Sequence, residues 1–214
     1  GVGNQSYGYF GGGKAGNTTD YLTGTTGYSN VDRLDYSSDS TNMSPKGPLS
    51  GARGYVAATG NASYGYFAGG GSDVNSNVST IDRIDYASDT STASPKGPMT
   101  DVLWGISASG TPSYGYIYGG LGNQSLPFGF VPGSTPANFW RDAATNAKSY
   151  VQRIDFSNDT VTLSPRGNLQ RKLYMTGSTS SQSNANTTPV TLGPNDVREN
   201  VTPQGTDFGY FGGG

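Results

Sequence analysis

Three arginine–aspartate pairs are the residues whose types and spacing could do chemistry. In each pair one position separates the two residues on a predicted strand, so both side chains lie on one face. Charged groups repeated in this way could form a ring of charge around a channel. The alternative is ion pairing or hydrogen bonding to neighbouring strands, and repetition in every repeat favours it, because a binding site is usually unique. The pairs are Arg33 with Asp35, Arg83 with Asp85, and Arg153 with Asp155.

Composition restricts the other chemistry that the chain could carry out. Its 214 residues contain no Cys and no His, which removes cysteine nucleophiles, histidine bases and the usual zinc and copper ligands. Glycosidases need two converging carboxylates, yet the single glutamate, Glu199, lies on a long insert. Asp39, Asp89 and Asp159 lie in turns, where we expect them to bond their own backbone and not to bind calcium. We therefore expect no enzymatic activity, no cofactor and no metal site.

Glycine runs at 11–13 and 69–71 could cradle a phosphate, with Lys14 beside the first run. A phosphate loop leads into the N-terminus of a helix, and no helical period follows either run. We expect the glycines to permit positive φ and close packing where strands end. A net charge of −2, with 13% charged residues, predicts no nucleic-acid partner. No apolar run approaches the roughly 20 residues of a membrane span, so no membrane partner is expected.

Two further sets of residues could bind or carry sugars. Phe139, Trp140 and Arg141 lie on a long insert, where aromatic rings could stack on sugars or anchor a protein partner. The alternative is a small core that holds this insert down. Nine Asn-x-Ser/Thr sequons lie mostly at predicted turns or inserts, and they are N-glycosylation sites if the producer is eukaryotic and polar turns if it is not. They are Asn4, Asn17, Asn42, Asn61, Asn77, Asn123, Asn158, Asn186 and Asn200.

A sequence repeat positions all of these residues. One stretch reads SYGYFGGG at 6–13 and recurs at 63–71, 113–120 and 207–214. A second block reads VDRLDYSSDSTNMSPKGPL at 31–49 and recurs at 81–99 and 151–169. Corresponding residues such as Asp35 and Asp85 are 50 positions apart where no insert intervenes. This is the period of kelch-type propeller blades.

The complete repeat at 51–99 predicts four short strands, and we expect proline at 95 to end the fourth. The fold class expected is all-β, with kelch-like β-propeller blades of four antiparallel strands. A little over three blades are present, because we expect the first repeat to lack its first strand and the last to hold only two strands. The expected strands are 53–59, 63–67, 80–86 and 90–94 in that repeat; 6–10, 31–36 and 41–44 before it; 103–109, 113–118, 150–156 and 160–164 after it; and 172–176 and 208–211 last.

Residues 1–214 are expected to form a single repeat region with three long inserts. Inserts 14–30 and 121–149 should share one face, and insert 177–207 should lie on the opposite face. Two open sheet edges invite pairing with another chain. We therefore expect a partial propeller that continues into further repeats or is completed by neighbouring copies of the chain. The blade cores are expected at about 6–49, 51–99, 101–169 and 170–214.

These residues resemble kelch repeats. The double glycines at 69–70 and 119–120 match the kelch glycine pair, and Asp85-Tyr86 and Asp155-Phe156 match its later pair. The arginine that follows the fourth kelch strand appears at Arg53, while the other repeats have Leu103 and Leu173. The amino-acid sequence of the repeat, with GYFGGG at 8–13 and SPKGPLS at 44–50, is similar to uncharacterised repeat arrays of marine cyanobacterial phages.

The resemblance implies a non-enzymatic structural and binding protein, at a virion surface or in a fibre, or otherwise extracellular. Its expected partners are further copies or repeats of the chain and glycans on a host surface. One alternative is a glycosylated extracellular filament subunit, which an intact mass above 22.2 kDa in hexose steps would reveal. A second alternative is a propeller enzyme that acts on carbohydrate.

Overall fold

The computed structural model describes residues 1–15, 26–71, 77–122, 146–180 and 209–211. These residues are all-β and form three four-stranded antiparallel sheets, none of them closed. The first sheet contains β1 (Val2–Gly3), β2 (Tyr7–Gly11), β5 (Val31–Asp35) and β6 (Ser44–Lys46). The second contains β7 (Ala57–Gly60), β8 (Tyr64–Ala68), β9 (Ile81–Asp85) and β10 (Ser94–Lys96). The third contains β12 (Ser107–Gly110), β13 (Tyr114–Tyr118), β15 (Val151–Asp155) and β16 (Ser164–Pro165).

Three two-stranded pairs and a single 3-10 turn complete the described part. The pairs are β3 (Lys14–Ala15) with β4 (Thr26–Gly27), β11 (Leu103–Trp104) with β14 (Leu121–Gly122), and β17 (Ser178–Ser180) with β18 (Gly209–Phe211). The 3-10 turn η1 spans Tyr86–Ser88. Within the described ranges, no helix is long and apolar enough to cross a membrane.

The three sheets share one register, so corresponding residues occupy corresponding places. In each sheet the second tyrosine of the Tyr-Gly-Tyr strand lies opposite the arginine of the next strand. The pairs are Tyr9 with Arg33, Tyr66 with Arg83, and Tyr116 with Arg153. The repeat in the sequence is therefore a repeat of side-chain positions in space.

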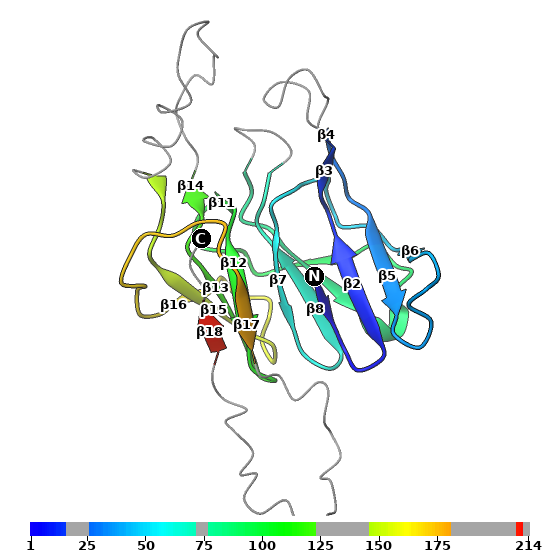
Figure 1. The fold of residues 1–214 in the computed structure, drawn as a ribbon. Helices are drawn as coiled ribbons and strands as arrows, with labels where there is room; N and C mark the ends of the chain where they lie inside the picture. The colour runs from blue at the N-terminus through cyan, green and yellow to red at the C-terminus, as the bar shows by residue number, and fades with distance from the viewer. Residues whose placement is uncertain (16–25, 72–76, 123–145, 181–208, 212–214) are drawn as a thin grey trace, which may run out of the picture.

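The sheets stand side by side in chain order, with the first at the right of Figure 1 and the third at the left. Their first strands pack against one another, because β1 contacts β7, β7 contacts β12, and β12 contacts β17. Two apolar clusters fill the gaps between sheets. Tyr9 and Phe67 belong to the cluster between the first and second sheets, and Ile117 and Phe156 belong to the cluster on the third-sheet side.

Strand β9 of the middle sheet is buried on both faces. In β9 the neighbouring residues Ile81 and Asp82 point to opposite faces, yet both are 0% exposed. A strand covered on both faces can keep a charged residue such as Asp82 only if that residue is paired.

Several strand boundaries differ from the sequence prediction. The first repeat does have a first strand, since β1 pairs with β2 through Val2 and Gly3. The fourth strands begin at Ser44, Ser94 and Ser164, later than expected, because the preceding residues form turns. Proline does not end β10 but lies within it, which an edge strand tolerates. The strands expected at 53–59 and 103–109 are observed as β7 and β12, shifted toward the C-terminus, with Leu103 and Trp104 in β11. The strand expected at 172–176 is wrong, because only an isolated bridge forms there and β17 begins at Ser178.

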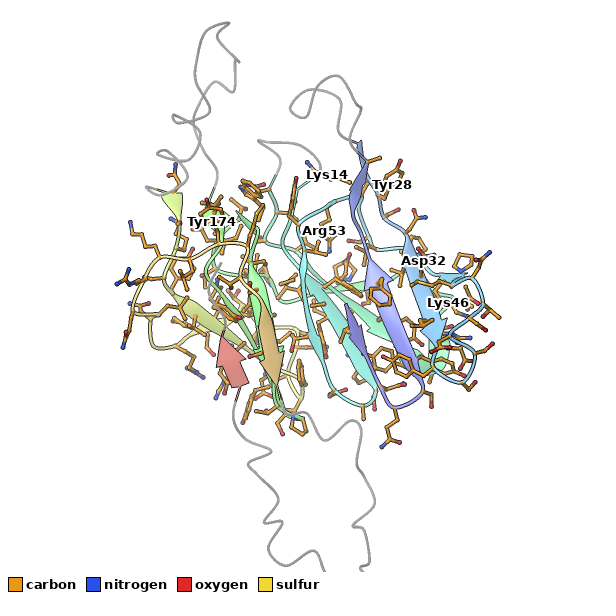
Figure 2. The ribbon with its side chains drawn as sticks, in the orientation of Figure 1. Lys14, Tyr28, Asp32, Lys46, Arg53 and Tyr174 are labelled. Carbon is orange, nitrogen blue, oxygen red and sulfur yellow. The ribbon has the colours of Figure 1, made fainter. Side chains whose placement is uncertain are left out.

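The described residues that flank the inserts lie at two edges of the sheets. β3 and β4, which flank residues 16–25, lie at the upper edge, and Figure 2 shows Lys14 and Tyr28 there. β14 precedes residues 123–145 and lies at the same edge in Figure 1. The inserts 14–30, 121–149 and 177–207 are largely outside the described residues, and the faces assigned to them stay a prediction.

Candidate functional site

The charged residues of the repeat meet at the contacts between sheets. Asp89, from the turn before β10, accepts hydrogen bonds from the first sheet: Tyr9 Oη donates to its Oδ2 at 2.9 Å, and Arg33 Nη1 donates at 2.7 Å. Lys46 Nζ lies 3.4 Å from Asp89 Oδ1. The Arg33 guanidinium also lies over the ring of Tyr7, 4.2 Å from its centroid. We call this arrangement an aspartate joint.

A second aspartate joint connects the second and third sheets. Tyr66 Oη donates to Asp159 Oδ2 at 2.9 Å, and Arg83 Nη1 donates to the same oxygen at 2.8 Å. Lys96 Nζ lies 3.8 Å from Asp159 Oδ1. The side chains of Asp89 and Asp159 are only 9% and 8% exposed. Each joint therefore satisfies a nearly buried carboxylate with donors from the preceding sheet.

Backbone bonds and stacked rings reinforce both joints. At each joint the glycine after the preceding sheet's lysine donates its N–H to the carbonyl oxygen of the joint aspartate. A proline carbonyl accepts an N–H from the turn in return. An aromatic ring at the end of the following repeat's third strand stacks on the joint tyrosine. At the first joint the Gly47 N–H donates to Asp89, the Ala93 N–H donates to Pro48, and the rings of Tyr9 and Tyr86 stack with centroids 4.8 Å apart. At the second joint the Gly97 N–H donates to Asp159, the Leu163 N–H donates to Pro98, and the rings of Tyr66 and Phe156 stack with centroids 4.9 Å apart.

A buried ion pair lies at the first contact between sheets. Arg53 Nη2 donates to Asp82 Oδ2 at 2.8 Å, and the two side chains are 4% and 0% exposed. The backbone N–H and hydroxyl of Ser50 donate to the same carboxylate at 2.8 and 3.0 Å. The third sheet uses neutral residues instead: Gln152 Oε1 accepts from the N–H and hydroxyl of Thr100 at 2.7 and 2.9 Å, and a leucine replaces the arginine.

This difference between repeats predicts a compensated exchange. Arg53→Leu alone should lower the free energy of unfolding by about 3–5 kcal/mol, because Asp82 loses its buried counter-ion. Arg53→Leu with Asp82→Gln reproduces the pair found at the next contact and should recover most of this loss. Urea unfolding of wild type, both single variants and the double variant measures the effect. Simple additivity of the two single losses would contradict the structural role assigned to the pair.

The arginines and aspartates predicted as pairs do not bind each other. The aspartate of each pair caps the turn that follows: Asp35 Oδ1 accepts from the Ser37 N–H at 2.9 Å, and Asp85 Oδ1 accepts from the Ala87 N–H at 2.9 Å. Asp155 Oδ1 does the same for Ser157. Hydrogen bonds from these serines lower the pKa of Asp35 and Asp155. The arginines and the aspartates of these pairs therefore have separate structural roles.

The expectation for the turn aspartates was wrong at two positions. Asp89 and Asp159 were expected to bond their own backbone, but their side chains reach the preceding sheet. The sequence contained a signal for these contacts, because the repeat before each of these aspartates carries the tyrosine and the arginine that bind it. In the first sheet the corresponding Asp39 is exposed.

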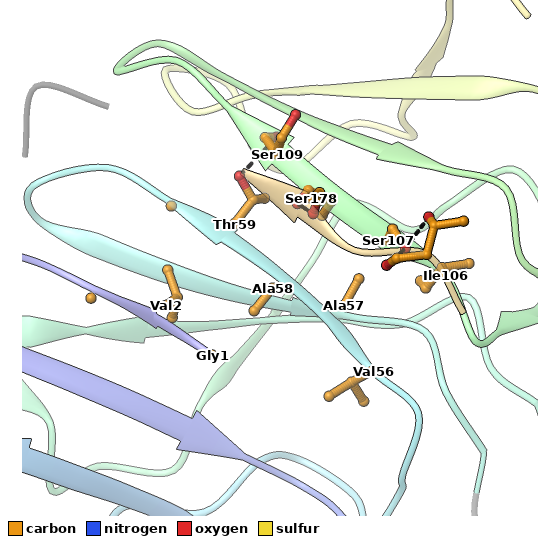
Figure 3. Close-up of a pocket in the computed structure, with 14 residues that line it drawn as sticks. Gly1, Val2, Val56, Ala57, Ala58, Thr59, Ile106, Ser107, Ser109 and Ser178 are labelled. Carbon is orange, nitrogen blue, oxygen red and sulfur yellow. Dashed lines mark hydrogen bonds between the residues drawn. The ribbon is translucent and has the colours of Figure 1, made fainter. Parts of the chain in front are cut away.

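A cavity of about 400 Å³ lies between the first strands of the sheets. Figure 3 shows its small side chains, including the Thr59 hydroxyl that donates to the carbonyl oxygen of Ser109 at 3.1 Å. None of the described side chains that line this cavity is ionisable. Within the described ranges there is also no cluster of three or more residues suited to hold a metal.

The remaining predicted sites are only partly within the described residues. Phe139, Trp140, Arg141 and four sequon asparagines (Asn17, Asn123, Asn186 and Asn200) lie outside them. Asn42 and Asn158 are exposed, as a glycan would require. The Oδ1 atoms of Asn4 and Asn61 accept backbone bonds within tight turns. Asn77 is only 8% exposed, so its amide is poorly placed to carry a glycan.

The aspartate joints predict a loss of stability at high pH. Burial, with the hydrogen bond to Asp89, raises the pKa of Tyr9 to about 12. Burial, with the hydrogen bond to Asp159, also raises the pKa of Tyr66. An unfolded tyrosine titrates near pH 10. The folded chain then retains protons that the unfolded chain has lost, so stability falls as pH rises from about 10 to 12.

This titration can be measured by urea unfolding at pH 8 to 11.5. Tyr9→Phe should be less stable than wild type at pH 8, by about 1 kcal/mol for the lost hydrogen bond, and its stability should fall less steeply with pH. Tyr28→Phe, at an exposed tyrosine outside the joints, serves as the control. An identical slope for Tyr9→Phe and wild type would contradict the prediction.

Comparison with known proteins supports the fold alone. No protein-family model matches the chain, and no curated protein matches it. A solved structure titled "Structure of YjhT" is similar, with a TM-score of 0.53 and 12% identity over 72% of this chain. The match covers 42% of that chain, so this protein spans less than half its length.

Proposed function

We propose that the three sheets and the β17–β18 pair are blades of an incomplete kelch-like propeller. We further propose that the protein is a non-enzymatic structural and binding module of a virion surface or fibre. In this proposal the cavity lined by β1, β7, β12 and the residues leading to β17 lies on the propeller axis. The long inserts lie on the rims and contact glycans of a host surface. The partners are therefore other repeats of the same kind and carbohydrate.

One observation carries the proposal: the repeated charged residues of the first two sheets either connect one sheet to the next or cap a turn. Arg33 and Arg83 each donate to an aspartate of the following repeat, and Asp35 and Asp85 cap turns. A catalytic pair of carboxylates would have to converge on a substrate. Among the described residues that line the cavity, none has an ionisable side chain. This favours a structural role over an enzyme acting on carbohydrate.

Binding of the intact chain to an array of glycans tests the proposal. We expect binding to one class of glycans, and at least about tenfold loss for Trp140→Ala with Arg141→Ala, at an unchanged melting temperature. Phe10→Ala is the control, since it removes an exposed aromatic ring that lies on β2, outside the inserts. Release of reducing sugar from any glycan would favour the enzyme instead, and absence of binding would remove the glycan from the proposal.

The glycosylated filament subunit remains the second candidate because Asn42 and Asn158 are exposed sequon asparagines. The intact mass of the protein from its native source separates the two. Hexose-spaced additions would favour the filament subunit, and their absence would favour the virion protein.

A further inference from the structure

Three residues at one end of the cavity share the left-handed backbone conformation. Tyr55, Gly105 and Met175 have φ angles of 59°, 59° and 51°. The Gly105 N–H donates to the Tyr55 carbonyl oxygen at 3.2 Å, and the Met175 N–H donates to the Gly105 carbonyl oxygen at 2.7 Å. Figure 3 shows Val56 and Ile106, which follow Tyr55 and Gly105, at the right-hand end of the cavity. We call Tyr55, Gly105 and Met175 the collar.

Two collar residues adopt this conformation at a cost in stability. The left-handed region suits glycine, because a side chain at positive φ is crowded by the backbone. Gly105 therefore fits the collar, whereas Tyr55 and Met175 are strained there. Burial does not compensate for the strain, since the two residues are 49% and 48% exposed. Strained residues cluster at functional sites, which indicates a role for the Tyr55 ring at the surface.

A second aromatic ring lies beside the collar. The ring centroids of Trp104 and Tyr55 are 5.1 Å apart, with the two planes tilted by 59°. Trp104 lies opposite Leu121 in the β11–β14 pair and packs against the apolar cluster of Leu121 and Ala147. Lys14 Nζ lies 5.4 Å from the centroid of the Tyr55 ring. The two rings are therefore held at an angle to each other, and neither residue is buried.

Hydroxyl groups lie next to the collar on the cavity side. Ser107 Oγ donates to the Thr176 carbonyl oxygen and lies 2.7 Å from Thr176 Oγ1. A hydroxyl has one donor and two acceptor lone pairs, so this pair has hydrogen-bonding capacity beyond these bonds. The described side chains that line the cavity include no ionisable group. The collar end of the cavity thus combines aromatic rings with neutral hydrogen-bonding groups.

We propose that the collar, Trp104 and the hydroxyl pair of Ser107 and Thr176 bind a neutral saccharide at this end of the cavity. The inference rests on the proposed function, and it names the class of sugar and the residues that bind it. The C–H face of one sugar ring lies on the aromatic rings of Tyr55 and Trp104. Its hydroxyls exchange hydrogen bonds with Ser107 and Thr176, and Met175 contacts its edge.

The chemistry of these groups favours a sugar over other ligands. A sugar ring has an apolar C–H face and polar hydroxyls, which match an aromatic surface beside neutral hydroxyls. A phosphate group would need cations among the residues that line the cavity. A stable protein interface needs about 800 Å² on each partner, whereas three partly exposed large side chains offer roughly 300 Å². The exposed area therefore suits one or two sugar units.

Substitutions at Tyr55 separate the ring from the strained backbone. Tyr55→Gly removes the ring and the strain, Tyr55→Ala removes the ring alone, and Tyr55→Phe keeps both. We expect Tyr55→Gly to melt at a higher temperature than Tyr55→Ala, since glycine suits a φ of 59°. Calorimetric titration with neutral hexasaccharides of glucose, mannose and galactose measures binding. Both variants without the ring should bind at least about tenfold more weakly than wild type, and Tyr55→Phe should bind like wild type.

Tryptophan fluorescence locates the bound sugar. The chain has two tryptophans, so Trp140→Phe leaves Trp104 as the only one. A sugar stacked on Trp104 should change the emission of this variant as the site fills. A hexamer of galacturonic acid, the charged counterpart of the galactose probe, should bind more weakly than the best neutral probe. Phe10→Ala, which removes an exposed ring on β2, is the control and should bind like wild type.

Four results would overturn the proposal. They are wild-type binding by Tyr55→Gly, a lower melting temperature for Tyr55→Gly than for Tyr55→Ala, unchanged Trp104 emission at saturating sugar, and tighter binding of the galacturonic acid hexamer than of every neutral probe. Loss of glycan binding in Trp140→Ala with Arg141→Ala, with full binding by Tyr55→Gly, would reject the collar site and leave the proposed function intact. Absence of binding to every glycan would reject the collar site and the glycan part of the proposed function together.

Discussion

Asp159→Ala should lower the free energy of unfolding by about 3 kcal/mol. The substitution leaves the Tyr66 hydroxyl and the Arg83 guanidinium without their shared acceptor, and the Asp159 side chain is only 8% exposed in the folded chain. Removing one partner of a nearly buried charge pair costs about 3–5 kcal/mol, and the partial exposure of Arg83 places this joint at the lower end. Urea unfolding at neutral pH measures the loss.

The matched control is Asp39→Ala, at the same position of the first repeat. Asp39 is exposed and no described residue of a preceding sheet contacts it, so the change should stay within about 0.5 kcal/mol. The comparison belongs at a concentration where the chain is monomeric. Equal losses for the two variants would show that the aspartate stabilises its own turn and that the joint contributes little.

Gly97→Ala should destabilise the chain by about 3 kcal/mol or more. The added Cβ would meet the backbone of Val161 in the next repeat's turn, and backbone cannot move aside as a flexible side chain can. Overpacking of a close contact typically costs about 1–3 kcal/mol and occasionally more. The same collision would weaken the bond from the Gly97 N–H to the Asp159 carbonyl oxygen, 2.7 Å long in the folded chain.

Gly167→Ala provides the control for Gly97→Ala. Its repeat position is the same, but a Cβ there would meet nothing within 4 Å. We expect a change within about 0.5 kcal/mol in the monomer. Thermal unfolding of the two variants separates them, and similar melting temperatures would mean that the contact between repeats is looser than the structure indicates.

The 50-residue period and the Tyr-Gly-Tyr strands were sufficient to predict an all-β chain of four-stranded antiparallel sheets. They could not fix where the outer strands begin, because an edge strand tolerates the proline at 95. They also missed β1, since a strand of two residues leaves almost no pattern. Strand existence followed from periodicity, whereas strand ends depended on local turns.

The aspartate joints could have been predicted but were not. Asp89 was interpreted from its own turn, whereas its partners Tyr9 and Arg33 lie one repeat earlier. A comparison of repeats would also have shown that Asp82 is present with Arg53, while Gln152 is present where the arginine is replaced by leucine. Residues that change together between repeats indicate a contact. The insert residues around Trp140 offered no such comparison, because only one repeat contains them.

A double-mutant cycle between Arg83 and Asp159 tests most directly whether the repeated charges hold successive repeats together. Urea unfolding of wild type, Arg83→Ala, Asp159→Ala and the double variant gives the interaction free energy. We predict about 1.5–3 kcal/mol, the range for a hydrogen bond to a charged group at a nearly buried site. An interaction free energy below about 0.3 kcal/mol would contradict the account, because the two residues would then stabilise the fold independently.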